Sequence, residues 1–416
     1  MSQRSYLIGP FLCGSASWIL ANSTVSLIPL YAMERGASAA GGGLVLSFAY
    51  LCLTLGTATG ALLPREFSHR RFLVAACGVL AAVACLLVSR TTTLATFAAA
   101  SGASWFLAGS VATQATIMTG LAAPAGERGR ALGTVGMTGG LGSVIGGLGA
   151  GWLADRCGFA SVYQGIAVVC VLMIAGGLLA VEAPTSTLAR ATGRARGFPR
   201  PRDIVAAFGV GFLLLLSANL LLSLTNASAV LGRALRMNQQ GFPKLSINVT
   251  QSISGVVSLS LPLVLGWLSD RIGRKWILAG SYLVVSMGLL VLAWSHAFWQ
   301  FGLFAALIAF LSVSLGIGPA FVLDVVPGRN AARGVSIFQS VFWGGNIAGT
   351  ALLGLVYQRL GTVAPVIAAA LLPVLGIGFL LLVRRTGARV AARGEPPATP
   401  GVIPSARWVR RRGTGL

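Results

Sequence analysis

The sequence predicts an all-α membrane protein with twelve transmembrane helices in two pseudo-symmetric six-helix bundles. The first observation is composition: 55% of the residues are hydrophobic, 10% are charged and the mean hydropathy is +0.82. The surface of a soluble chain of this size does not tolerate such values. The second observation is that the charged residues leave long, mostly apolar segments between them. A helix that crosses a bilayer needs about 20 apolar residues, and each segment meets that need.

The predicted helices are bounded by charged or histidine residues. In chain order they are Ser5–Met33, Gly36–Pro64, Phe72–Ser89, Thr91–Gly126, Ala131–Ala154, Cys157–Val181, Ile204–Gly232, Leu245–Ser269, Trp276–Ser295, Ala297–Leu323, Gly334–Gln358 and Leu360–Val383. They lack the apolar–polar alternation, roughly ten residues long, of outer-membrane barrel strands. The first segment is too long for the apolar region of a cleavable signal peptide.

The 31 basic residues are distributed unevenly between the two predicted sides. If the first helix starts in the cytoplasm, the basic residues on the outside are Arg35, Arg90, Arg156, Arg233, Arg236, Lys244 and Arg359, and all the others are inside. This excess follows the positive-inside rule and predicts a multi-pass protein of the plasma (inner) membrane with both termini cytoplasmic. We therefore attribute the net charge of +22 mostly to basic residues that fix the orientation of the helices in the membrane. Because the charges lie in loops without interleaved aromatics, we expect no nucleic-acid partner.

The chain divides into two halves at a polar, basic linker that contains several prolines. The predicted parts are an N-terminal six-helix bundle at 1–183, a cytoplasmic linker at 184–203, a C-terminal six-helix bundle at 204–384 and a basic, disordered cytoplasmic tail at 385–416. The halves repeat residues at a nearly constant offset, since Arg128-Gly129 recurs as Arg333-Gly334. Parallel six-helix repeats with a substrate site between them are an architecture of secondary transporters.

The segment from Gly266 to Lys275 reads Gly-Trp-Leu-Ser-Asp-Arg-Ile-Gly-Arg-Lys and lies between the eighth and ninth predicted helices. It resembles the signature loop of the major facilitator superfamily. Residues 127–133 and 324–334 resemble that family's paired loops before spans 5 and 11. The first-half copy of the signature is degraded, because Pro64 occupies the position of the aspartate. The resemblance covers residues 5–385 and implies the superfamily's fold, without indicating a substrate.

The same resemblance implies a gate at the cytoplasmic side. The aspartate of the signature would cap a neighbouring helix and pair with an arginine when that side is closed, with Arg333 and the nearby Asp324 as its natural partners. A charge-assisted latch of this kind breaks and re-forms between two states. Ordinary charges that fix topology are the alternative. The predicted gate residues are Gly266, Asp270, Arg271, Gly273, Arg274, Lys275, Asp324, Arg333 and Arg128.

Span 5 is rich in glycine, and it carries Gly142-x-x-x-Gly146 and Gly147-x-x-x-Gly151. These pairs predict two faces of small residues that permit close helix crossing. The segment resembles the span-5 motif of exporters in the superfamily, with Gly147 in place of the central proline and Ala150 in place of a glycine. The resemblance favours efflux, although tight packing alone needs no direction.

The acidic residues and both histidines all lie in loops, at span ends or in the tail, so the sequence places no ionisable side chain in mid-membrane. Such groups mark proton relays and sites for charged substrates. The sequence therefore argues against a coupling carboxylate in a span and against a strongly charged substrate held by an arginine. Proton coupling through Asp203 or Glu182, near the inner mouth, is left open.

The predicted binding cavity is built from neutral polar and aromatic side chains. The candidates are Asn22, Trp105, Gln114, Asn219, Asn226, Gln251, Gln339, Trp343 and Asn346. Amides suit hydroxyl, amide or carbonyl groups, because they offer donors and acceptors together. Gln339, Trp343 and Asn346 follow a spacing that places them on one helical face. The alternative is that the amides only join neighbouring helices, at about 0.6 kcal/mol each on average.

We therefore expect a secondary active transporter that moves a small neutral or weakly charged organic solute by alternating access, with export of a drug or metabolite as the favoured direction. Facilitated uptake of a polar solute such as a sugar is one alternative, and a non-transporting membrane scaffold or sensor is another. No nucleophile–base pair lies within a span, which argues against an enzyme. Without CxxC or paired histidines, no metal, disulfide or cofactor is expected. The expected partners are a small-molecule substrate and the lipid bilayer, and the chain is expected to be a monomer.

Overall fold

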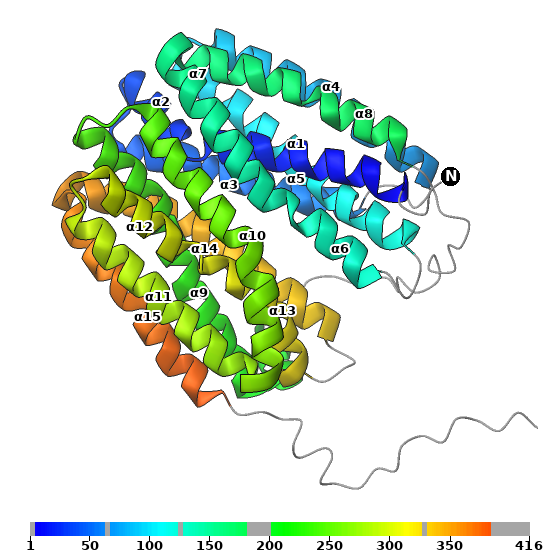
Figure 1. The fold of residues 1–416 in the computed structure, drawn as a ribbon, viewed down its shortest axis with the longest axis vertical. Helices are drawn as coiled ribbons and strands as arrows, with labels where there is room; N and C mark the ends of the chain where they lie inside the picture. The colour runs from blue at the N-terminus through cyan, green and yellow to red at the C-terminus, as the bar shows by residue number, and fades with distance from the viewer. Residues whose placement is uncertain (1–4, 63–66, 124–127, 181–200, 327–330, 384–416) are drawn as a thin grey trace, which may run out of the picture.

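The computed structural model describes residues 5–62, 67–123, 128–180, 201–326 and 331–383, which are helical and contain no strand (Figure 1). A short 3-10 turn, η1 (Ser5–Leu7), precedes the first helix. The helices are α1 (Ile8–Thr24), α2 (Leu27–Glu34), α3 (Ala39–Leu62), α4 (Phe67–Arg90), α5 (Leu94–Ala122), α6 (Arg128–Gly136), α7 (Thr138–Val169), α8 (Val171–Leu179), α9 (Pro201–Gln239), α10 (Lys244–Ile272), α11 (Arg274–Trp294), α12 (Phe298–Ile308), α13 (Leu311–Val325), α14 (Ala331–Leu360) and α15 (Val363–Leu382).

The described helices provide twelve passes through a bilayer. Nine helical stretches are each long and apolar enough to span a membrane, and α1 with α2, bent by 46° at the break between them, form a tenth. One of the nine, Ala131–Leu179, is 49 residues long and turns back at Gly158, where φ is +81°, so it provides two passes. The 29-residue α10 is not among the nine, but it is long enough to provide the twelfth. The prediction of an all-α membrane protein with twelve transmembrane helices is confirmed.

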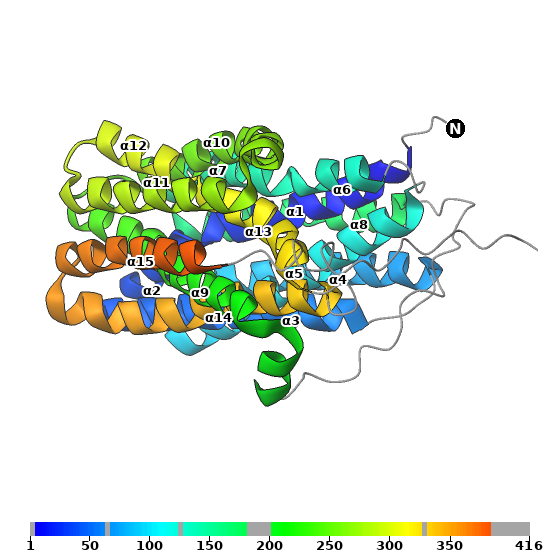
Figure 2. The ribbon, with the colours of Figure 1, turned by 90° about the horizontal axis from the view of Figure 1, so that it is seen from below.

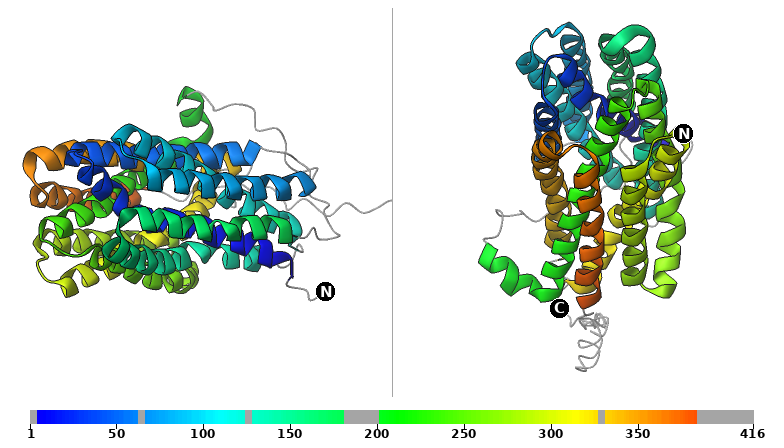
Figure 3. Two further views of the ribbon diagram at one scale, coloured as in Figure 1. Left: turned by 90° about the horizontal axis from the view of Figure 1, so that it is seen from above. Right: turned by 90° about the vertical axis from the view of Figure 1, so that its left-hand side faces the viewer.

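Helix α9 is longer than the sequence predicted. The expected span ended at Gly232 because a charge follows, but the helix continues to Gln239 and stops before Gly241, whose φ of +76° a helix does not accommodate. At its other end α9 starts at Pro201 and is kinked at Gly209, so that a short first segment projects from the bundle (Figure 3). Arg233 and Arg236, assigned from the sequence to an outer loop, therefore lie inside a helix and are buried.

The helices run roughly parallel, and α1–α8 form one half of the molecule while α9–α15 form the other (Figures 1 and 2). The halves approach each other near α2 and separate toward the end that holds the N-terminus (Figure 1). We call the end that holds Glu34, Asp155 and Lys244 the predicted outer end. The opposite end is the predicted cytoplasmic end.

Glycines on α7 permit close helix crossing, as the sequence predicted, and one of their two faces forms a seam between the halves. A Cβ on Gly142 would lie 2.6 Å from the backbone of Trp18 on α1, within the same half. On another face of α7, a Cβ on Gly147 would lie 2.6 Å from the Asn248 carbonyl oxygen, and one on Gly151 would lie 2.7 Å from Leu245 Cα, both on α10 of the opposite half. The two faces of small residues are confirmed. They let three backbones approach where lipid gives no hydrophobic drive for association.

A second seam joins α3 to α14. A Cβ on Gly43 would lie 2.6 Å from the carbonyl oxygen of Thr350 and 2.9 Å from Cα of Gly354. One turn further along α3, the Ser47 hydroxyl donates a hydrogen bond of 2.7 Å to the Ile347 carbonyl. Both seams lie toward the predicted outer end. The halves are therefore held together there and diverge toward the predicted cytoplasmic end.

Candidate functional site

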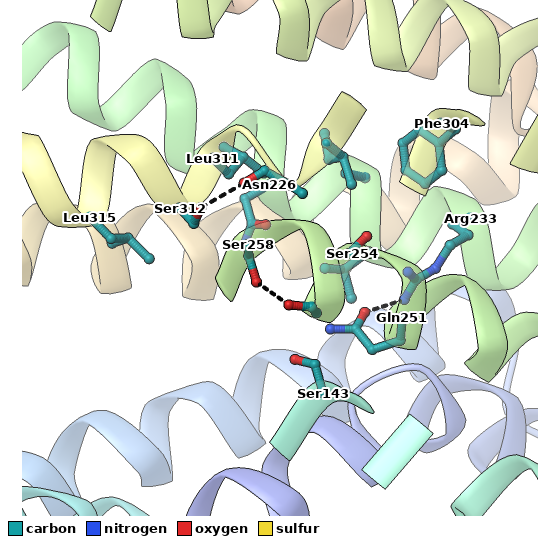
Figure 4. A pocket seen from close by; sticks show the side chains of 15 residues that line it. Ser143, Asn226, Arg233, Gln251, Ser254, Ser258, Phe304, Leu311, Ser312 and Leu315 are labelled. Carbon is teal, nitrogen blue, oxygen red and sulfur yellow. Dashed lines mark hydrogen bonds between the residues drawn. The ribbon is translucent and has the colours of Figure 1, made fainter. Parts of the chain in front are cut away.

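A cavity of about 160 Å³, lined by polar and apolar side chains, lies between helices of both halves (Figure 4). Its volume is close to that of an engineered cavity of about 150 Å³ that takes up benzene. The lining comes from α7 in one half and from α9, α10, α12, α13 and the α12–α13 connection in the other. These residues are Ser143, Asn226, Ala229, Val230, Arg233, Gln251, Ser254, Gly255, Ser258, Phe304, Ile308, Ala309, Leu311, Ser312 and Leu315. Apolar side chains on both sides of the break between α12 and α13 contribute to this lining.

Arg233 lies in this cavity wall with 2% of its surface exposed. Its Nη2 donates hydrogen bonds to Ser26 Oγ at 2.6 Å and to Gln251 Oε1 at 2.8 Å. Its buried Nε–H has no hydrogen-bond partner. Among the residues that the structure describes, no carboxylate forms an ion pair with it. The assignment of Arg233 to an outer loop is therefore wrong, since it lies buried within the span Phe208–Gln239, near the outer end of that span.

A short polar network extends from Arg233 across the two halves. Gln251 accepts the bond from Arg233 and donates its own Nε2–H to Asn22 Oδ1 at 3.4 Å. Asn22 in turn donates to the Gly139 carbonyl at 3.4 Å. Ser26, the other partner of Arg233, is fully buried at the break between α1 and α2. Two predicted site residues, Asn22 and Gln251, are thus brought together with an arginine that the sequence placed elsewhere.

Two of the other predicted site residues, Gln114 and Asn219, mainly join helices. Gln114 accepts a bond of 2.9 Å from Arg70 and donates one of 2.6 Å to the Gly60 carbonyl. Asn219 donates to the Phe338 carbonyl at 2.8 Å. Arg70 was expected in a cytoplasmic loop, but it lies on α4 with 7% of its surface exposed. The amides of Gln114 and Asn219 therefore form hydrogen bonds between helices, which was the alternative to lining the binding cavity.

Trp105 is buried, and its Nε1–H donates to Thr24 Oγ1 at 3.0 Å. Its ring meets that of Tyr50 edge to face, with 5.3 Å between centroids. Tyr50 also faces Trp343 of the opposite half at 6.1 Å. The aromatic rings of Tyr50 and Trp343 thus pack against each other across the two halves, close to the seam of α3 and α14.

The residues expected to share one face of α14 differ in burial. Asn346 is fully buried, accepts a bond of 2.7 Å from Asn226 Nδ2 and donates one of 2.9 Å to the Phe342 carbonyl. Gln339 and Trp343 are half-buried. Of the nine predicted binding residues, Asn226 and Gln251 line the cavity of Figure 4.

The predicted cytoplasmic gate shows one ion pair in the part of the chain that the structure describes. Arg274, at the start of α11, donates to Asp324 Oδ1 at 2.8 Å and to the Ala320 carbonyl at 2.6 Å, both on α13. Lys275 donates to the Leu381 and Val383 carbonyls at the end of α15. These contacts tie three passes of the same half together, and they do not cross between the halves.

The remaining gate residues have different surroundings. Gly273 has a φ of +104° and forms the turn between α10 and α11. Arg271 stacks over the Trp267 ring at 3.9 Å, whereas Arg333 is exposed. Gly266 faces open space. The side chains of Asp270 and Arg128 lie outside those that the structure describes, so the latch between Asp270 and Arg333 stays a prediction.

A set of contacts at the predicted outer end was missed from the sequence. The Asp155 carboxylate, at the end of span 5, accepts the backbone N–H groups of Lys244 at 2.9 Å and Leu245 at 2.7 Å. It therefore caps the first turn of α10, which belongs to the opposite half, where a negative charge is favoured. Lys244 Nζ also lies 3.4 Å from Glu34 Oε1. The sequence offered one clue, a lone acidic residue directly after a glycine-rich span.

The comparisons with known proteins agree with this geometry. Over 149 residues the chain is 28% identical to the tetracycline resistance protein, class C, of Escherichia coli, a match that spans 35% of this chain and 37% of that relative. The fold resembles a bacterial homologue of the human lysosomal transporter Spinster in an inward-facing, unoccupied conformation, with a TM-score of 0.68 and 15% identity over 92% of this chain and 97% of that one. It also resembles the inward open xylose transporter XylE from E. coli, with a TM-score of 0.68 and 14% identity over 92% of this chain and 95% of that one.

The family model of the Major Facilitator Superfamily matches residues 10–259 and, in a second match, 208–414. Together the two matches span nearly the whole chain. They agree with the residues that carried the resemblance in the sequence and with the twelve helical passes of the structure. This transport protein of a membrane belongs to the major facilitator superfamily.

Proposed function

We propose that the protein exports a small organic solute by alternating access, using the cavity beside Asn226, Arg233 and Gln251. The observation that supports this most directly is that the cavity is lined by α7 of one half and by α9, α10, α12 and α13 of the other. A solute bound there touches both halves. Rocking of one half against the other would then expose the same solute to each side in turn.

The contacts between the two halves at the predicted outer end are weak enough to break and re-form during a transport cycle. The ion pair of Glu34 and Lys244 has side chains that are 50% and 31% exposed, so solvent screening limits it to about 1 kcal/mol or less. The bonds of Asn22 to its neighbours are long, at 3.4 Å. Contacts of this strength favour one state without preventing the other. We propose that the described arrangement is closed outside and open toward the cytoplasm.

Two observations favour export. The glycine seam of span 5 resembles the exporter motif, and the relative at 28% identity is named for tetracycline resistance. That relative is matched over about a third of its length, so its activity supports the proposed direction without defining the solute. By the positive-inside rule, both termini face the cytoplasm of a cell whose plasma (inner) membrane holds the protein.

Facilitated uptake of a polar solute is the second candidate, and the amide-lined cavity favours it. Asn226 and Gln251 supply neutral donors and acceptors of the kind that bind hydroxyl groups. The fold that the chain shares with the xylose transporter is compatible with it. A membrane scaffold or sensor that transports nothing is the third class. It differs from the other two in showing no flux of any solute.

Transport by vesicles separates these functions. Tetracycline and xylose serve as first probes, followed by a panel of small organic acids, amides and sugars, in proteoliposomes with and without the protein. Export predicts uphill movement that depends on an imposed ion gradient, together with reduced accumulation by producing cells. Facilitated uptake predicts equilibration that ignores the gradient. Binding of a soluble partner with no flux of any probe under any gradient would contradict both transport proposals.

A further inference from the structure

We propose that Arg233 is an anion-binding residue and that the solute of this cavity carries one carboxylate group beside an apolar body. The inference rests on the proposed function, because it takes the cavity of Figure 4 to be the solute site. It narrows the neutral or weakly charged solute expected from the sequence to an anion, against the sequence-based argument that no arginine holds a charged substrate.

The first argument is charge. Arg233 is always protonated in proteins, it has 2% of its surface exposed, and no carboxylate of the described residues pairs with it. Its partners, Ser26 and Gln251, are neutral. A buried guanidinium that keeps its charge without a counter-charge is strongly disfavoured, whereas an anion beside it removes much of that penalty. A single positive charge is matched by a single negative one, which favours a monocarboxylate over a phosphate dianion.

The second argument is hydrogen-bond geometry. A guanidinium offers five N–H groups, and the two bonds to Ser26 and Gln251 both leave from Nη2. The Nε–H of Arg233 is buried without a partner. Both N–H groups of Nη2 are thus used within the protein, and the remaining N–H groups of the guanidinium are not. A charge-assisted bond from the guanidinium to a carboxylate oxygen is stronger than one to a neutral acceptor.

The third argument is the remainder of the wall. The hydroxyl groups of Ser254, Ser258 and Ser312 donate to the carbonyls of Ala305, Gly255 and Ala309. Their protons are therefore used within the protein, and Arg233 is the strong donor that faces the cavity. Phe304, Ile308, Leu311 and Leu315 also line the cavity and offer an apolar surface to a hydrocarbon body. A volume of about 160 Å³ suits a solute with one small ring.

Benzoate and benzamide test this directly, because they have nearly the same size and differ in charge. Each is titrated into the purified full-length protein at constant pH and ionic strength, and binding is followed by thermal unfolding and tryptophan fluorescence. We expect benzoate to bind and benzamide to bind far more weakly. Arg233→Gln should lower benzoate affinity roughly ten- to a hundredfold, the effect of losing a hydrogen bond to a charged group. Arg233→Lys should lower it less, since it keeps the charge but not the planar fork.

Arg236→Gln is the matched control. Arg236 is also buried, lies three positions further on the same helix and does not line the cavity; it donates to the Ser295 carbonyl. This variant should keep benzoate binding. Equal binding of benzoate and benzamide, no binding of benzoate, or unchanged binding by Arg233→Gln would each overturn the proposal. The comparison of the two probes in the unaltered protein decides the matter even if a variant fails to fold.

The transport assay keeps this proposal separate from the proposed function. Arg233-dependent binding of benzoate without flux of any solute would uphold the anion site and reject transport through it. Gradient-dependent flux that Arg233→Gln leaves unchanged would uphold transport and reject the anion site.

Discussion

Gly147 and Asn248 belong to opposite halves of the protein, and their backbones are so close that a Cβ on Gly147 would lie 2.6 Å from the Asn248 carbonyl oxygen. Real side-chain carbons do not approach an oxygen so closely, so α7 and α10 must move apart to accept an alanine. Gly147→Ala should therefore weaken the closure at the predicted outer end by about 1–3 kcal/mol, the usual effect of overpacking. Spin labels at positions 157 and 238, both exposed at that end, should report a longer distance.

Gly149→Ala is the control, because a Cβ on Gly149 meets nothing within 4 Å. Both substitutions replace glycine by alanine on the same helix, so they change its helix propensity equally. Identical label distances in the two variants would show that the seam does not hold the outer end closed.

Asp155→Ala should destabilise the same closure by a different route. The substitution removes the acceptor of two backbone N–H groups at the start of α10, and loss of a helix cap is typically worth about 0.5–2 kcal/mol. Asp155→Asn keeps one acceptor and should have a smaller effect. Hydrogen exchange in the first turn of α10 is the measurement. Protection that stays at the unaltered level in Asp155→Ala would contradict this role.

Gln114→Leu should leave Arg70 without the Oε1 atom that accepts its bond at 2.9 Å. Because Arg70 has 7% of its surface exposed, little water is available to replace that acceptor. We expect a loss of about 1–3 kcal/mol in thermal or denaturant unfolding. The double substitution Arg70→Leu with Gln114→Leu should recover part of it, and equal losses in the single and double variants would contradict the coupling.

The ion pair between Arg274 and Asp324 should contribute modestly. Its side chains are 25% and 34% exposed, so we expect a coupling free energy of about 1 kcal/mol or less from a double-mutant cycle with Arg274→Gln and Asp324→Asn. A charge exchange, Arg274→Asp with Asp324→Arg, should restore more stability than either reversal alone. A coupling near zero would show that the carbonyl of Ala320, the other acceptor of Arg274, supplies the contact.

The fold was accessible from the sequence because the bilayer imposes it. Spans must be long, apolar and helical, and each of these requirements is visible in the distribution of charges. The two glycine faces of span 5 were also predictable, since Gly142 and Gly146 share one helical face and Gly147 and Gly151 another. Their close contacts with α1 and α10 follow from the absence of side chains.

The site was less accessible, because a charge was taken as the end of a span. Arg233 lies within α9, and the partners that hold it, Ser26 and Gln251, are 207 and 18 positions away in the chain. No local pattern reveals such partners. The same is true of Gln114 and Asn219, whose amides form interhelical bonds rather than lining this cavity. Residue type predicted that these groups would form hydrogen bonds, but only the tertiary structure identifies the partners.

The cavity wall has a constant electrical charge. Its polar members are serines, two amides and one guanidinium, and none of these groups exchanges a proton between about pH 5 and pH 9. Acidity within that range cannot alter the wall itself. Any acid response of the transport cycle must therefore originate in the cargo or in groups outside this wall.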